Sequence, residues 1–112
     1  MTSIKRGTTP TIVVQIDGIT PEDIQKIEFI FKHNAKESAK EICYKVYPGN
    51  DVTFDQQSGC FHISVTEDET RAFLAGATGY MDTRITLLNG SIPATDIAQF
   101  VVMETLFKAV ES

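Results

Sequence analysis

The chain contains no tryptophan, only two cysteines and no long uninterrupted run of apolar residues. A membrane-spanning helix needs about 20 consecutive apolar residues, so no membrane insertion is expected. The first ten residues lack the apolar core of a signal peptide, which predicts folding in a cytoplasm. Because free thiols are the default in a reducing compartment, we expect Cys43 and Cys60 to be unpaired.

Basic residues are few and scattered. Ten Lys and Arg residues stand against 15 Asp and Glu residues, which gives a formal net charge of −5. The densest basic stretch is the dipeptide Lys5-Arg6. Binding to nucleic acid requires Lys and Arg side chains that neutralise phosphates, so no nucleic-acid partner is expected.

Short segments with alternating apolar residues, separated by turn residues, fill most of the chain. This pattern predicts an all-β sandwich or barrel, in one domain that spans residues 1–112. The segments IQKIEFIFKH and CFHISV show the alternation most clearly. Their expected inward residues are Ile27, Phe29, Phe31, Phe61, Ile63 and Val65.

Three further stretches complete the predicted strands. In EICYKVY, alternation assigns Ile42, Tyr44 and Val46 to one face. The dipeptide Asn89-Gly90 predicts a two-residue type I′ hairpin turn, in which both residues have positive φ. The last strand is expected over residues 97–106, after Pro93, which cannot donate to a strand ladder.

One break in the alternation predicts a short helix. Thr66 and Glu69 have the spacing of a capping box, and acids in a first turn oppose the positive end of the helix dipole. Successive helical residues point about 100° apart, so Glu67, Asp68 and Glu69 cannot converge on a metal ion. Phe73 and Leu74 supply the apolar face of this helix. A single helical turn is predicted at residues 20–23.

Other polar residues form no recognisable catalytic or metal-binding set. Cys60 and His62 are two residues apart on the predicted outer face of a strand, without a third ligand nearby. Arg84, within a strand, is expected to pair with an acid across the sheet, and Asp82 and Glu104 are the candidates. No phosphate-binding glycine loop or nucleophile elbow is present, so no enzyme, cofactor or metal site is predicted.

Four features of the sequence together resemble a known family. They are Arg6-Gly7-Thr8-Thr9-Pro10 before the first strand, IQKIEFIFKH, SVTEDETRAF, and the Asn89-Gly90 turn before a closing strand. This arrangement resembles small tail-module proteins of phages and prophages in Gram-positive bacteria. It is similar in turn to the N-terminal domain of upper baseplate proteins, an immunoglobulin-like β-sandwich. The order of the acids in residues 66–70 and the presence of Asp82 depart from the family pattern.

The resemblance, which spans nearly the whole chain, implies an antiparallel immunoglobulin-like β-sandwich with one short helix between strands. Phe73 would then close one end of the core. It also implies a non-enzymatic virion structural protein without catalytic residues or cofactors. Such a protein would occupy the host cytoplasm before assembly and the virion tail afterwards. Its partners would be copies of itself, as a homo-oligomer, or other phage tail proteins.

Candidate interface residues are Tyr44 or Tyr47 and the apolar run from Phe100 to Phe107. In this run the residues at positions 100–103 are all apolar, so both faces of the strand are apolar. One face is expected to pack in the core and the other to be covered by the helix or by a partner, of which we favour the partner. Phe100, Val102 and Phe107 are the residues of the run named for this contact. The alternative function is a carbohydrate- or ligand-binding β-sandwich. Sugar sites commonly stack on exposed aromatic side chains, and a chain with three Tyr and no Trp is poorly equipped for that role.

Overall fold

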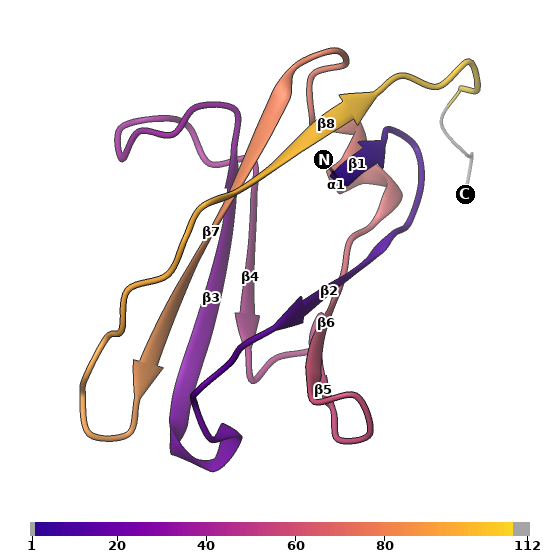
Figure 1. The fold of residues 1–112 in the computed structure, drawn as a ribbon. Helices are drawn as coiled ribbons and strands as arrows, with labels where there is room; N and C mark the ends of the chain where they lie inside the picture. Colours follow the sequence, from indigo (N-terminus) through magenta and orange to yellow (C-terminus); the bar gives the residue numbers. More distant parts are fainter. Residues whose placement is uncertain (1, 109–112) are drawn as a thin grey trace.

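The structure is a computed structural model that describes residues 2–108, and these residues form two β-sheets that pack as a sandwich (Figure 1). The larger sheet has five strands in the order β1-β8-β7-β3-β4, and the smaller has three in the order β2-β6-β5. In chain order the elements are β1 (Thr2–Lys5), β2 (Thr11–Gln15), the 3₁₀ turn η1 (Pro21–Asp23), β3 (Ile24–Lys32), β4 (Cys43–Tyr47), β5 (Val52–Asp55), β6 (Cys60–Ser64), α1 (Glu67–Arg71), β7 (Thr78–Leu87) and β8 (Ala98–Met103).

The strand order is that of an immunoglobulin-like domain, as the resemblance implies. Strands β2, β6 and β5 take the places of strands B, E and D, and β8, β7, β3 and β4 take those of G, F, C and C′. The first strand differs, because β1 pairs in parallel with β8 instead of lying beside β2. As a result β2 is an edge strand of its sheet.

The core lies between the sheets and is built from alternating apolar residues, as predicted. All six inward residues expected on β3, on β6 and just after β6 are buried. Aromatic rings fill one end of the core, where Phe31, Phe73 and Phe100 meet edge to face with ring centroids 5.4–6.2 Å apart. Edge-to-face packing of this kind stabilises a core beyond the area that it buries.

The face of β4 that carries Ile42, Tyr44 and Val46 is the outer one. Cys43 and Lys45 are buried, and Tyr44 points to the outer face, where it lies opposite Ile30. Alternation groups these residues on one face but does not say which face is inward, because a lysine occupies an inward position, where its charge is paired inside the protein.

Two predictions for the strands need correction. Asn89-Gly90 lies in a turn where Gly90 has positive φ but Asn89 does not, so the turn is not type I′. A long irregular link, residues 88–97, follows β7, and the last strand is shorter than predicted, since β8 ends at Met103. The sequence pattern also missed β1, whose few residues show little alternation.

Both predicted helical segments are present. The turn at residues 20–23 is the 3₁₀ turn η1, although Thr20 makes no side-chain capping bond there. Helix α1 has the predicted capping box: Thr66 Oγ1 accepts from the backbone N–H of Glu69, and the Glu69 carboxylate accepts from the N–H of Thr66. The helix ends at Arg71, before Phe73 and Leu74.

Candidate interaction surfaces

Glu69 caps α1 and also ties it to the opposite strand. Its Oε1 atom accepts hydrogen bonds from the backbone N–H of Thr66 and from Nζ of Lys45, both at 2.8 Å. Lys45, on β4, also donates to Oδ2 of Asp51 at 3.1 Å, and the thiol of Cys43 lies 3.4 Å from Oε2 of Glu69. A buried ammonium group with two carboxylate partners is satisfied, so the cluster anchors the helix to the sheet.

The ionisation of this cluster follows from its contacts. Burial disfavours the charge of Lys45, but its hydrogen bonds to Glu69 and Asp51 outweigh this and raise its pKa. Burial likewise opposes the charge of Glu69, yet the bonds from Lys45 and Thr66 lower its pKa. Burial, together with the charge of Glu69, raises the pKa of the Cys43 thiol to about 12. A thiol that stays protonated is a poor nucleophile, so Cys43 is unsuited to covalent chemistry.

Phe73 lies buried next to α1, at the position predicted for the plug. It is 1% exposed and contacts Phe31 and Phe100. His33 covers it from outside with ring centroids 5.7 Å apart, and Nε2 of His33 accepts from the backbone N–H of Leu74 at 2.8 Å. Leu74 does not contribute to the apolar face as predicted, since it points into solvent.

Two of the segments that carry the family resemblance lie against each other. The backbone N–H of Gly7 donates to Oγ1 of Thr70, and this hydroxyl lies 2.9 Å from the backbone oxygen of Thr8. Arg6 donates to the backbone oxygen of Arg71 at 3.0 Å. Gly7 has a φ of +78°, and a Cβ atom there would lie 2.7 Å from Nη2 of Arg71. The Arg-Gly-Thr motif therefore joins the start of the chain to α1.

The same junction holds the segment that follows β8. The guanidinium of Arg6 forms an ion pair with Glu104 at 2.9 Å, and Nη2 of Arg71 donates to the backbone oxygen of Phe107 at 3.3 Å. The N-terminus, α1 and the segment after β8 consequently lie at one end of the molecule (Figure 1). The segment leaves the side chains of Leu106 and Phe107 exposed, at 100% and 80%. Glu104 is thus the partner of Arg6, and not of Arg84 as one prediction had it.

The two faces of β8 differ, which corrects part of the predicted interface. Phe100 and Val102 are 4% and 1% exposed and belong to the core, so they cannot form a surface for a partner. Val101 and Met103 occupy the outer face. The apolar residues of this run that remain available are therefore Val101, Met103, Leu106 and Phe107.

The outer face of the five-stranded sheet carries a polar network centred on Glu28. Arg84, directly opposite on β7, donates to Glu28 through Nε at 2.8 Å and Nη2 at 3.0 Å. The hydroxyl of Tyr44 donates to the same carboxylate at 2.7 Å. The bonds from Arg84 and Tyr44 lower the pKa of Glu28 to about 2. Arg84 was predicted to pair across the sheet, but its partner is Glu28 instead of Asp82.

Of the two tyrosines predicted as interface residues, Tyr44 is 44% exposed and reaches the surface through this network. Tyr47 points the other way and packs against Phe61, with ring centroids 5.0 Å apart. Its partly buried ring belongs to the rim of the core, so it offers less surface to a partner than Tyr44.

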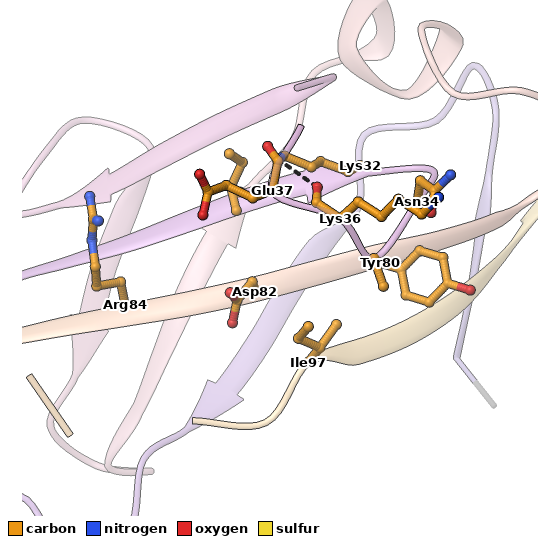
Figure 2. Close-up of a pocket in the computed structure, with 10 residues that line it drawn as sticks. Lys32, Asn34, Lys36, Glu37, Tyr80, Asp82, Arg84 and Ile97 are labelled. Atoms are coloured by element: carbon orange, nitrogen blue, oxygen red, sulfur yellow. Dashed lines mark hydrogen bonds between the residues drawn. The ribbon is translucent and has the colours of Figure 1, made fainter. Parts of the chain in front are cut away.

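A groove of about 350 Å³ adjoins the Glu28 network on the outer face (Figure 2). Tyr80, Asp82 and Arg84 of β7 form one wall, and the loop between β3 and β4 forms the other. Lys32 fixes this loop by donating to the backbone oxygens of Glu37 at 2.8 Å and Lys36 at 3.2 Å. The groove combines an aromatic ring with groups of both charges.

Other sites considered in the sequence are not assembled by the fold. Within residues 2–108, no group of three or more His, Cys, Asp or Glu side chains is placed to hold a metal ion. His62 lies 4.0 Å from Asp55, and both cysteines are free thiols. No helix in the described part of the chain has the length and apolar character needed to cross a membrane.

No family model matches the chain, and no curated protein matches it in sequence. Among solved structures, it is similar to a chain from a study of parallel homodimers of the extracellular domains of the voltage-gated sodium channel beta4 subunit, concerned with cell-cell adhesion. The two share 13% identity, over 94% of this chain and 92% of that one, with a TM-score of 0.42. A likeness this weak carries no argument about function.

Proposed function

We propose that this chain is a non-enzymatic structural protein of a phage or prophage virion. It acts as a tail or baseplate assembly module through protein–protein contacts with copies of itself or with other tail proteins. It would fold in the host cytoplasm and then become part of the virion tail. The observation that carries the proposal is the exposure of apolar side chains on the outer face of β8 and in the segment after it, where Leu106 and Phe107 lie. Exposed apolar surface of this kind is typical of interaction sites.

The family resemblance supports the proposal from the sequence side. Two of the segments that carry it meet in space, where Gly7 and Thr8 contact Thr70. Their contacts are internal to the domain, which fits a motif that maintains a scaffold. The charged side chains also support a non-enzymatic role. Lys45 forms an ion pair with Glu69, and Arg84 forms one with Glu28, so these groups have a structural use.

The proposal can be tested on particles. A bacterial strain that encodes the chain would be induced to release its prophage, and the particles would be purified by density and analysed by mass spectrometry. We expect the chain at a fixed ratio to the tail proteins, and immunogold labelling at the tail end. Intact particles that lack the chain would contradict the proposal.

A second candidate is a carbohydrate- or ligand-binding module. The groove beside Tyr80 favours it, since it offers an aromatic ring next to Asp82, Arg84 and Asn34. A glycan array distinguishes the two functions: binding that Tyr80→Ala abolishes, while Tyr44→Ala leaves it unchanged, would favour the ligand-binding module.

A further inference from the structure

Strand β2 has an open edge with unpaired backbone groups. Within residues 2–108 it pairs only with β6. Pro10 accepts a hydrogen bond from Val65, the residue opposite it in the register, and bonded pairs recur at every second residue of an antiparallel ladder. Ile12 and Val14 therefore bond to β6, while the N–H and C=O groups of Thr11, Val13 and Gln15 point to the open side. In an immunoglobulin domain strand A occupies that side.

The other edge strands carry features that discourage pairing, and β2 does not. Charged residues, inward-pointing charges and short length protect sheet edges. Strand β1 is four residues long and ends in Lys5, β5 is four residues long and ends in Asp55, and β4 holds the buried Lys45. Strand β2 has five residues, TIVVQ, none of them charged, and its central Val13 is 57% exposed.

A groove runs beside this edge between the two sheets; its first hollow is lined mainly by apolar residues, and Asp17 and Asp96 are among the residues at the second. It consists of adjoining hollows of about 280 and 300 Å³ that share Val14, Met81 and Ala98. Phe31 and Phe100 line the first hollow, and Ile85 lines the second. A strand added to β2 would direct every second side chain into this groove and cover it.

The chain itself provides a segment with the matching chemistry. Leu106 and Phe107 are the most exposed large apolar side chains of the described residues, and they are consecutive. In an added strand one of them would face the groove, and the other would lie beside Val13. Since the chain carries a net charge of −5, copies repel one another least where the contact surfaces are uncharged, as in TIVVQ and the run Thr105-Leu106-Phe107.

We propose that the segment after β8 of one copy adds as a strand to the open edge of β2 of a second copy, with Leu106 or Phe107 in the groove. This inference rests on the proposed function, because it names one contact through which an assembly module joins its copies. Strand addition draws affinity from main-chain bonds and specificity from alternate side chains. The donor and acceptor surfaces differ, so the contact is head-to-tail and builds rings or filaments.

Two variants separate the donor from the acceptor. Leu106→Ser with Phe107→Ser removes the apolar donor, and Leu88→Ser with Ile92→Ser, at other exposed apolar positions, is its matched control. Val13→Pro removes the central outward N–H of the acceptor, and Val13→Thr is its control because it keeps that N–H. Far-UV circular dichroism and melting curves would establish that each variant is folded.

Mass in solution, from light scattering during size exclusion at several concentrations, is the test. We expect wild type and both controls to form oligomers that grow with concentration, and each test variant alone to be a monomer. An equimolar mixture of the two test variants should form a dimer of twice the monomer mass, since it contains one intact donor and one intact acceptor. If Val13→Pro does not fold, a peptide of residues 103–112 replaces it in the test. Binding of this peptide to the donor variant would be monitored by NMR shifts at residues 11–15.

Three results would overturn the inference: a monomeric wild type at every concentration, oligomers unaffected by the donor variant, or no dimer in the mixture and no binding of the peptide. None of them would decide the proposed function, which depends on whether particles contain the chain. A chain that is present in particles but does not associate through β2 would refute this contact alone.

Discussion

Lys45 and Glu69 form an ion pair inside the sandwich, with Nζ 2.8 Å from Oε1, although 24 residues separate them in the chain. Removing one partner of a buried pair leaves the other charge uncompensated. We expect Lys45→Met to lower the free energy of unfolding by about 3 kcal/mol, the low end for such pairs because Glu69 is partly exposed. Urea unfolding would measure the change.

The double variant Lys45→Met with Glu69→Gln tests whether the loss of stability comes from the unpaired carboxylate of Glu69. Glu69→Gln keeps an oxygen for the N–H of Thr66, so the capping box survives while the charge disappears. Lys45→Met with Glu69→Gln should therefore be more stable than Lys45→Met alone. Strictly additive losses in this double-mutant cycle would mean that the two side chains do not interact.

The Glu28 carboxylate should make stability depend on pH in the acid range. Its pKa is lowered to about 2 in the folded protein, mainly by the hydrogen bonds from Arg84 and Tyr44. A lowered pKa contributes stability that is complete above the ordinary value of 4.5 and is lost as the pH falls from there towards 2. Melting temperatures of wild type should therefore fall more steeply over this range than those of Glu28→Gln. Parallel curves would contradict the ion pair.

Phe73→Ala should be severely destabilising. Truncating a fully buried phenylalanine costs about 3–5 kcal/mol, a large share of the stability of a small domain. The adjacent Leu74→Ala is the matched control, because Leu74 is exposed and should cost little. Glu67→Ala and Asp68→Ala should also have small effects. Equal melting temperatures for Phe73→Ala and Leu74→Ala would refute the role of Phe73 as the plug.

Gly79→Ala should destabilise the protein through a steric clash with Phe100. A Cβ atom at position 79 would lie 2.1 Å from Cζ of that ring, which is held between Phe31 and Phe73. Overpacking of a core typically costs about 1–3 kcal/mol. Thr78→Ala, at the exposed neighbouring position, serves as the control. If the clash is the cause, Phe100→Leu should be better tolerated in the Gly79→Ala background than in wild type.

The sequence was sufficient to predict what depends on local pattern. Alternation identified the inward residues of β3 and β6, and spacing identified the capping box of Thr66 and Glu69. The inward face of β4 was not predictable in this way, because Lys45 faces inward only where it can pair with Glu69. Strand β1 was missed because it depends on parallel pairing with β8, far along the chain.

The candidate surfaces also depended only in part on local sequence pattern. Apolar content marked the run from Phe100 to Phe107 as an interface, but strand periodicity places Phe100 and Val102 in the core. Leu106 and Phe107 are exposed because they lie beyond the end of β8 at Met103. The groove beside Tyr80 and the hollow beside β2 each join segments that are distant in sequence. Neither could be recognised without the arrangement of the two sheets.

The junction of Arg6 and Gly7 with Thr70 and Arg71 has a consequence for recognising relatives. Its hydrogen bonds fasten the first residues of the domain to α1 and use no group of the outer sheet face or of the open edge of β2. Chains that share this junction can therefore share an architecture while they differ in what they bind. A search based on the junction would gather proteins by scaffold, and the partner of each would have to be sought in residues outside the junction.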